Sequence, residues 1–298
     1  MAVTSFFSAF IVYKHISFIS FTGILQNLPK NFTTVLSVVK FCSILCEIIT
    51  ISGGIHMSIV SDIEKLKKEK NAVILAHYYV DEDVQDVADY IGDSFYLSKV
   101  ATKVSQDRII FAGVEFMGES AKILNPKKRV FMPDMNADCP MAHMADKDEI
   151  LALREKYDDL AVVCYINSTA ELKKYSDVCV TSSNAVKIVK NLPNKNIFFI
   201  PDRNLGSYVA KQCPDKNFIF NNGCCPRHVV ITKDMVLKAK ELHPEARFAA
   251  HPECTEDVLA FADYVGSTSG IIDYVVDTDA DEYIIGTVDG VFLSLIHI

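Results

Sequence analysis

Residues 61–79, SDIEKLKKEKNAVILAHYY, contain the pattern that decides the fold. Ser61–Lys70 is charged and amphipathic with an Asp in its first turn, which predicts a helix. Ala72–Tyr79 is a short apolar run that ends in one His and two Tyr, which predicts a buried strand with polar side chains at its end. A helix that passes directly into a short buried strand is typical of an α/β protein.

The same alternation recurs along the rest of the chain. Short apolar runs are separated, in most cases, by segments with helical periodicity. Short apolar strands that alternate with helices predict parallel sheets covered on both faces, which is a three-layer α/β/α arrangement. The further predicted strands are Arg108–Val114, Arg129–Met132, Leu160–Asn167, Val178–Thr181, Asn196–Ile200, Phe218–Phe220, Arg247–Ala250, Tyr264–Val265 and Glu282–Ile285.

A weak internal repeat indicates several units of similar plan. Thr181–Val189 aligns with Ser267–Val275, because each has hydroxyl residues at the end of a strand and then a helix with apolar positions in register. We interpret this as three small α/β units, with chance similarity between strand-to-helix turns as the alternative. Ligands of open parallel sheets bind at the carboxyl ends of the strands, so we expect the functional site there.

Polar side chains follow most of the predicted strands. A single Ser or Tyr at such a position usually caps a helix or forms a turn. Together, however, imidazoles, hydroxyls, an amide and a carboxylate can hold a polyanionic ligand and move protons. The residues concerned are His77, Tyr78, Tyr79, Asp93, Ser94, Tyr165, Asn167, Ser168, Thr181, Ser182, His251, Glu253, Ser267 and Thr268.

The composition favours small-molecule partners. Hydrophobic residues make up 50% of the chain, charged residues make up 23%, and the net charge is -8, which argues against a disordered chain and against a nucleic-acid partner. An anionic substrate stays compatible with this charge, because local His, Ser and backbone N–H groups can bind an anion within an acidic protein. Neither GxGxxG after a strand nor GxxxxGK occurs, so a nucleotide cofactor is disfavoured.

The cysteines point to reduced thiols. The chain has 9 Cys and no CxxC pair, a pattern that fits neither a disulfide scaffold nor a paired zinc knuckle. Two of them begin Cys-Pro loops that contain a His, residues 139–143, CPMAH, and residues 225–228, CPRH. Such rigid loops suit ligands of a soft metal, and buried structural thiols are the alternative interpretation.

The first 56 residues differ from those that follow. Their few charges interrupt the apolar runs before about twenty residues accumulate, which disfavours a membrane anchor, and no small-residue cleavage site is present. We predict that residues 1–56 are an unrelated apolar extension and that the ordinary chain, expected to be cytoplasmic, begins at Met57. The charged residues of this stretch are Lys14, Lys30, Lys40 and Glu47.

An ordered series of short motifs runs from about residue 57 to residue 292, and their order and spacing resemble those of the quinolinate synthase family. The resemblance implies a transferase of NAD biosynthesis that condenses iminoaspartate with dihydroxyacetone phosphate to give quinolinate, phosphate and water. The motifs are AHYY at 76–79, GDS at 92–94, FAGVEFMGESAKILNP at 111–126, ADCPMA at 137–142, YINS at 165–168, TSSNA at 181–185, HPE at 251–253 and GSTS at 266–269.

The resemblance also implies a fold and partners. It implies three similar α/β domains in a pseudo-threefold arrangement around a central [4Fe-4S] cluster that is held by three cysteines. Three protein thiolates leave one iron of such a cluster open to act as a Lewis acid. An L-aspartate oxidase is implied as the functional partner upstream, and neither nucleic acid nor a membrane is expected as a partner.

Residue roles follow from the same resemblance. Cys139 would be the first cluster ligand and Cys225 the second, because the family places that Cys three residues before a His, here His228. Cys224 would then be the spare thiol. Tyr79 and Glu253 would handle protons. The carboxylates and phosphate of the substrates would be held by His77, Ser94, Tyr165, Asn167, Ser182, His251, Ser267 and Thr268.

The C-terminal segment departs from the family. Residues 293–298, LSLIHI, do not resemble it, and no Cys follows Cys254, which we interpret as structural. We therefore expect a truncated copy without a third cluster cysteine. Two alternatives stay open: an impaired fragment that only binds a dicarboxylate or triose phosphate, and a zinc-binding protein that uses Cys225 and His228. The predicted domains are residues 1–56, 57–140, 141–222 and 223–298, the last without its C-terminal part.

Overall fold

The computed structural model describes residues 10–13 and 59–296. Residues 59–70 form a helix, so the helix predicted for Ser61–Lys70 is confirmed and begins slightly earlier. This helix belongs to a unit of its own and is described by itself, whereas residues 10–13 and 73–296 belong to one compact unit. Apart from residues 10–13, the predicted extension 1–56 lies outside the described residues.

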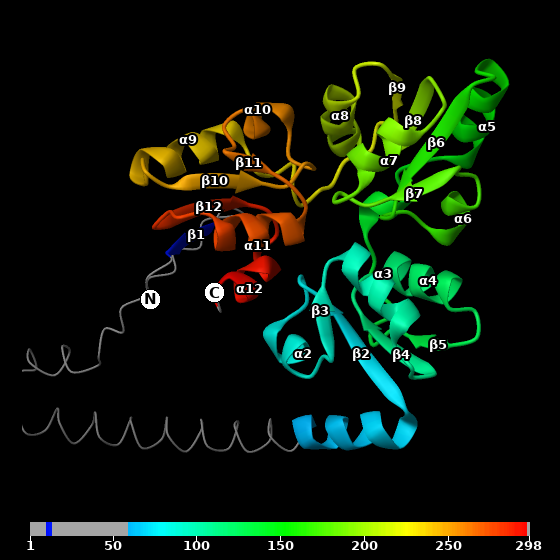
Figure 1. Cartoon of the computed structure of the whole chain (residues 1–298), viewed down its shortest axis with the longest axis vertical. Coiled ribbons are helices and arrows are strands. Elements are labelled where there is room, and N and C mark those ends of the chain that lie inside the picture. Colours follow the sequence, from blue (N-terminus) through cyan, green and yellow to red (C-terminus); the bar gives the residue numbers. More distant parts are fainter. Residues whose placement is uncertain (1–9, 14–58, 297–298) are drawn as a thin grey trace, which may run out of the picture. The chain divides into compact units, whose positions relative to one another are not determined.

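The first sheet of the compact unit has 4 strands in the order β3-β2-β4-β5 (Figure 1). Its elements are β2 (Ala72–His77), α2 (Glu82–Asp86), β3 (Tyr90–Gly92), α3 (Ser94–Lys103), β4 (Arg108–Ala112), α4 (Glu115–Leu124) and β5 (Arg129–Phe131). β2 pairs in parallel with β3, and β4 pairs in parallel with β5. Every residue of β2 is buried, as expected for an inner strand covered on both faces.

The second sheet repeats this plan with the order β7-β6-β8-β9. Its elements are α5 (Lys147–Lys156), β6 (Leu160–Tyr165), α6 (Ala170–Lys173), β7 (Val178–Val180), α7 (Ala185–Asn191), β8 (Asn196–Ile200), α8 (Arg203–Gln212) and β9 (Asn217–Phe220), and the short helix η3 (Pro140–His143) precedes them. β6 pairs in parallel with β7 and β8, and β8 with β9.

The third sheet differs at one edge. Its order is β1-β12-β10-β11, with β10 parallel to both β11 and β12. β1 (Phe10–Tyr13) pairs antiparallel with β12 and takes the place that β5 and β9 occupy in the other two sheets. The remaining elements are α9 (Lys233–Leu242), β10 (Arg247–Ala250), α10 (Glu256–Leu259), β11 (Tyr264–Val265), α11 (Thr268–Asp277), β12 (Glu282–Gly286), η4 (Asp289–Val291) and α12 (Phe292–Ile296).

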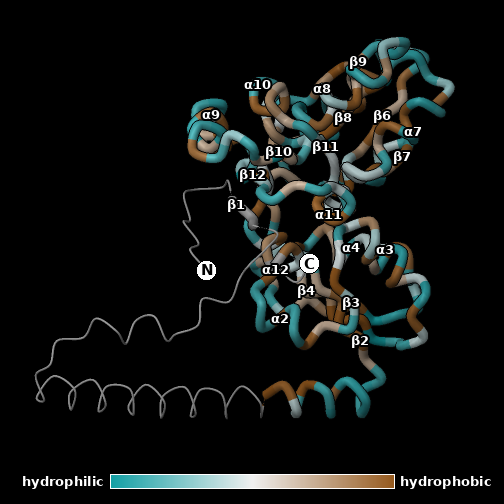
Figure 2. The backbone as a smooth tube through the Cα atoms, turned by 60° about the vertical axis from the view of Figure 1, so that its left-hand side comes forward, coloured by the Kyte–Doolittle hydropathy of each residue, from teal (hydrophilic) through white to brown (hydrophobic). Residues whose placement is uncertain are grey.

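Apolar residues concentrate in the inner strands and on the inward sides of the helices (Figure 2). Large side chains such as Phe111, Phe198 and Tyr283 are fully buried between the strands and the helices that cover them. Burial of such a side chain contributes about 1.5–3 kcal/mol to folding. The buried sheets therefore hold in place the polar segments that follow the strands, and these segments are free to line a site.

The predicted α/β alternation with parallel strands is confirmed, and the pseudo-threefold arrangement stays a prediction. Each predicted strand has an observed counterpart, whereas β1 and β3 were not predicted. β3 has only 3 residues, and two of them are exposed, so no buried apolar run marks it in the sequence. The run Ala72–Tyr79 was predicted too long, because the chain turns after His77 and carries Tyr78 and Tyr79 out of the sheet.

Candidate active site

One cavity of about 970 Å³ is lined by segments that follow strands of all three sheets. Parallel strands end at a common edge, so the loops beyond them meet there. The polar lining residues are His77, Tyr79, Asp93, Ser94, Asp138, Cys139, Tyr165, Asn167, Thr181, Ser182, Cys225, Arg227, His228, His251, Glu253, Thr268, Thr287 and Asp289.

The Glu253 carboxylate is the central charged group of this cavity. Its Oε1 accepts a 2.6 Å hydrogen bond from the Tyr165 hydroxyl, and its Oε2 lies 2.8 Å from His228 Nδ1. Because a carboxylate only accepts, His228 Nδ1 carries the proton in this contact. Burial alone would raise the pKa of Glu253, but the neighbouring imidazoles and the hydrogen bonds with His228 and Tyr165 hold it well below its ordinary value. Glu253 is therefore an ionised, buried base.

His77 and His251 are held in the same way at the ends of their strands. The backbone N–H of Tyr79 donates to His77 Nδ1 over 3.2 Å, and that of Glu253 donates to His251 Nδ1 over 3.4 Å. Nδ1 is thus the acceptor in both rings, which leaves Nε2 as the donor. Burial lowers the pKa of His77 to about 4 and that of His251 to about 3. Both rings are neutral at neutral pH and offer an Nε2–H donor.

Tyr79 joins the first sheet to the third. Its hydroxyl lies 2.9 Å from Thr268 Oγ1 and 3.2 Å from Thr287 Oγ1. Burial raises the pKa of Tyr79 far above its ordinary value, so this hydroxyl keeps its proton. Thr287 Oγ1 also lies 3.0 Å from His228 Nε2, which connects Tyr79 through two further side chains to Glu253.

The cavity contains two cysteines from different segments. Cys139 precedes η3, and burial raises the pKa of its thiol to about 11. Burial and the nearby Glu253 carboxylate raise the pKa of Cys225 well above its ordinary value. Cys225 Sγ lies 3.2 Å from His228 Nδ1, and the ligand atoms of Cys225, His228 and Glu253 all lie within 4.8 Å of one another. These three donors could hold a metal ion.

Asp202 fixes the loop that carries Cys225. Its Oδ2 accepts a 2.8 Å hydrogen bond from the Cys225 backbone N–H, and its Oδ1 caps α8 by accepting from Leu205 N over 2.7 Å. Asp202 is fully buried, and burial raises its pKa to about 8. The loop also needs Gly223, because a Cβ at this position would lie 2.5 Å from the carbonyl oxygen of Pro201.

Most of the side chains predicted for the site lie together in the cavity. These are His77, Tyr79, Ser94, Cys139, Tyr165, Asn167, Ser182, Cys225, His251, Glu253 and Thr268. Ser267 does not line it; its hydroxyl accepts from Gly270 N and caps α11. Thr287 and Asp202 were not predicted for the site. Each follows the end of a predicted strand by two residues, which is the same signal that indicated the other site residues.

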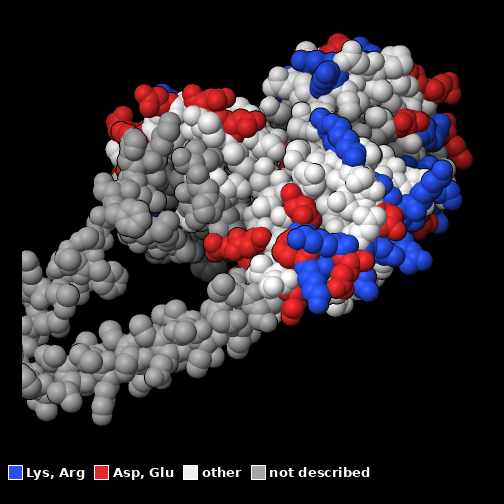
Figure 3. Space-filling view, turned by 60° about the horizontal axis from the view of Figure 1, so that its bottom comes forward, with Lys and Arg blue, Asp and Glu red and all other residues white. Residues whose placement is uncertain are grey.

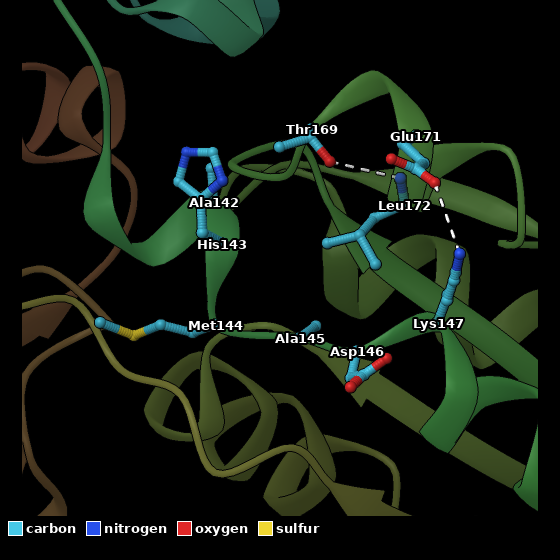
Figure 4. Close-up of a pocket in the computed structure, with 9 residues that line it drawn as sticks. All are labelled: Ala142, His143, Met144, Ala145, Asp146, Lys147, Thr169, Glu171 and Leu172. Carbon is cyan, nitrogen blue, oxygen red and sulfur yellow. Dashed lines mark hydrogen bonds and ion pairs between the residues drawn. The ribbon is translucent and has the colours of Figure 1, made fainter.

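A smaller hollow of about 390 Å³ lies between the start of α5 and α6. Its polar groups have partners: Lys147 lies 4.0 Å from Glu171 (Figure 4), Asp146 accepts from Asp148 N, and His143 lies 2.7 Å from Asp138 outside the hollow. Thr169 caps α6 there by accepting from Leu172 N. Because its polar groups have partners, this hollow is a weaker candidate than the larger cavity.

Comparisons with known proteins show the family of this chain. The family described as Quinolinate synthetase A protein matches residues 61–297. The chain belongs to this family. It is 61% identical to the quinolinate synthase of Fusobacterium nucleatum subsp. nucleatum over 229 residues, which cover 77% of this chain and 76% of that relative. It is 53% identical to the quinolinate synthase of Caldicellulosiruptor saccharolyticus over 234 residues, which cover 78% and 77%. The resemblance found in the motifs is thereby confirmed.

The quinolinate synthetase A region contains every element that lines the cavity. Among the described residues, no helix combines the length and the apolar character needed to cross a bilayer. On the face shown in Figure 3, Lys and Arg side chains lie among Asp and Glu side chains, so this part of the described surface carries no extended basic patch.

Proposed function

We propose that this chain is a quinolinate synthase, a cytoplasmic transferase of NAD biosynthesis that condenses iminoaspartate with dihydroxyacetone phosphate. The products are quinolinate, phosphate and water, and an L-aspartate oxidase is the proposed source of iminoaspartate. Family membership and the cavity with its proton-handling groups support this proposal. Both substrates are small anions with several oxygen atoms, so the cavity has to offer many hydrogen-bond donors and some acceptors.

One observation carries the proposal furthest. Asn167 Oδ1 is buried and has no hydrogen-bond partner, although its side chain lines the cavity. An unsatisfied buried acceptor costs about 1–3 kcal/mol, so one that lines a cavity is expected to accept a donor from what fills the cavity. The imino or hydroxyl group of a substrate is such a donor. The side chain of Asn167 therefore orients the substrate from the end of β6.

The donors for the anionic groups line the same cavity as Asn167. His77 and His251 offer neutral Nε2–H groups, and His251 Nε2 lies 3.3 Å from Ser182 Oγ. Together with Ser94 and Thr268 they bind carboxylate and phosphate oxygens. Because the two rings are uncharged without ligand, a bound anion raises their pKa and strengthens its own binding.

Two groups handle protons. Glu253 is ionised and takes the proton from a substrate carbon during loss of water. The Tyr79 hydroxyl keeps its proton and donates it to a developing oxygen anion, and Thr268 and Thr287 hold it in place. Glu253 is buried and Tyr79 is half-buried, which limits the access of bulk water to these protons.

Cys139 and Cys225 fit two of the thiolates that a [4Fe-4S] cluster needs. They line the same cavity, and a cationic metal centre offsets the burial that keeps their thiols protonated. When bound, the cluster supplies a Lewis acid for a substrate oxygen. Among the described residues no third cysteine lines this cavity, so a cluster held by Cys139 and Cys225 alone would lose iron readily.

A zinc site is the second candidate. Cys225, His228 and Glu253 present sulfur, nitrogen and oxygen atoms within 4.8 Å of one another, which is a donor set that zinc accepts. Anaerobic incubation with iron and sulfide, followed by metal analysis and a quinolinate assay, separates the candidates. Iron and sulfide with quinolinate formation support the synthase; substrate binding without product supports an impaired fragment; bound zinc that iron and sulfide cannot displace supports the zinc site.

A further inference from the structure

Two cysteines outside the cavity face each other across neighbouring strands. Cys164 of β6 and Cys179 of β7 are register partners in a parallel pair. Neighbouring strands lie about 4.8 Å apart, and the Cα atoms of a disulfide lie roughly 4.4–6.8 Å apart. Register partners also point to the same face of a sheet. The spacing and the orientation therefore both allow a bond between the two sulfur atoms.

The two thiols differ in their access to solvent. Cys164 is buried in the core cluster that contains Ile150 and Phe198, whereas Cys179 is exposed. β7 has 3 residues and lies at the edge of its sheet, next to β6 alone. A small oxidant reaches the pair through Cys179, and a short edge strand can adjust to a new covalent bond more easily than an inner strand.

The surroundings favour a thiolate in this pair. A hydrogen bond with the Cys179 side chain lowers the pKa of Cys164 to about 7; two serine hydroxyls and, least, the half-buried ammonium of Lys173 contribute in the same direction. The pKa of Cys179 rises in turn, because the two thiols share one proton. Lys173 is held by Ser120 Oγ at 2.8 Å and by the carbonyl oxygen of Phe116. By contrast, burial raises the pKa of Cys213.

We propose that Cys164 and Cys179 form a redox-active dithiol that a hydroperoxide converts reversibly into a disulfide. One thiolate attacks a peroxide oxygen, the O–O bond breaks, and the alcohol or water leaves as a sulfenic acid forms. The second thiol displaces water from this sulfur, and the S–S bond forms. In sum, two thiols and one hydroperoxide give a disulfide, an alcohol or water, and one further water. The two electrons lost by sulfur reduce the O–O bond.

The position of this pair connects it to the cavity. Cys164 is followed directly by Tyr165 and then by Asn167, and Cys179 is followed closely by Thr181 and Ser182. All four of these residues line the cavity. A disulfide would therefore join the two strands immediately before they deliver binding residues. The disulfide itself does not depend on the proposed catalytic function, and neither does its test.

The reduced full chain is treated with hydrogen peroxide, quenched with N-ethylmaleimide, digested and mapped by mass spectrometry. We expect a linked pair of peptides that contains Cys164 and Cys179, lighter by two hydrogen atoms than the separate peptides and separated again by dithiothreitol. Cys179→Ser, at an exposed position that does not risk the fold, abolishes this product. Cys213→Ser, in the same unit, retains it. Lys173→Gln slows disulfide formation at neutral pH by about five-fold, because less thiolate is present.

Three outcomes would overturn the proposal. The first is oxidation of Cys179 to sulfinic or sulfonic acid without any linked Cys164 peptide. The second is full N-ethylmaleimide labelling of Cys179 after peroxide treatment, which would mean that this thiol is not oxidised. A unique disulfide elsewhere in the chain would count against it in the same way.

Discussion

The Tyr165 hydroxyl donates a 2.6 Å hydrogen bond to Glu253 Oε1 and so joins the end of the second sheet to the segment after β10 in the third. Both side chains are buried. Short hydrogen bonds to ionised acceptors are stronger than those between neutral groups. The contact therefore positions the base and also holds two sheets together at the cavity.

Tyr165→Phe tests the structural part of this contact. It leaves one oxygen of a buried carboxylate without its donor, and we expect the free energy of unfolding to fall by about 2 kcal/mol. Urea denaturation measures this change. Tyr208→Phe is the matched control, because its hydroxyl donates to the neutral carbonyl oxygen of Val265 over 3.4 Å, and a smaller loss is expected. Equal losses in the two variants would contradict the importance of the charged contact.

Glu253→Gln tests the base. The amide keeps the size of the side chain but cannot take a proton, so quinolinate formation is expected to fall by about 10²–10⁴-fold. Steady-state rates of the cluster-loaded chain measure the effect, with iron content determined in parallel. Glu256→Gln, at an exposed position three residues further on, should leave the rate unchanged. A Glu253→Gln variant with full iron content and an undiminished rate would exclude Glu253 as the base.

Asn167→Ala separates ligand binding from folding. Because Asn167 Oδ1 has no partner in the protein, its removal costs little stability, whereas a bound substrate loses an acceptor. We expect an unchanged melting temperature and a dissociation constant for the substrate about ten-fold higher. Asn191→Ala, which removes an exposed side chain that donates to the carbonyl oxygen of Lys187, is the control for binding. A large loss of stability in Asn167→Ala, with binding intact, would assign this side chain a structural role.

Much of this site could be predicted, because two features of the sequence indicate where a strand of an α/β protein ends. The apolar run that ends at Tyr165 marks the strand, and the polar residues after it mark the edge. Pairings between distant segments leave no such mark. Nothing local in the sequence indicates that Tyr79 reaches Thr268, or that Asp202 binds the backbone N–H of Cys225. β3 was missed for a related reason, since its exposed residues carry no hydrophobic signal.

Stability should fall below neutral pH through the buried histidines. The pKa of His77 is lowered to about 4 in the folded chain, so between about pH 6.5 and 4 the unfolded state binds more protons than the folded state. On going from pH 7 to 5 this difference removes about 2 kcal/mol. Asp202, whose pKa is raised to about 8, acts in the opposite direction. Asp202 contributes equally in the unmodified chain and in a variant at His77, so its contribution cancels when the two chains are compared.

The measurement is therefore a difference between two chains. The free energy of unfolding is determined at pH 7 and at pH 5 for the unmodified chain and for His77→Asn, which cannot titrate in this range. We expect the decrease between the two pH values to be smaller in His77→Asn. An identical decrease in both chains would mean that His77 has an ordinary pKa in the folded state.

Replacement of single cysteines tests the cluster assignment. Cys139→Ser and Cys225→Ser each leave one thiolate in the cavity, so both variants should retain no iron and sulfide after anaerobic reconstitution and gel filtration. Cys224→Ser is the control, because Cys224 does not line the cavity and should match the unmodified chain. Addition of a chelator should strip iron from the unmodified chain within the time of the experiment, because two thiolates hold a cluster less firmly than three. Iron retention by Cys225→Ser together with loss in Cys224→Ser would reverse the assignment of the two neighbouring thiols.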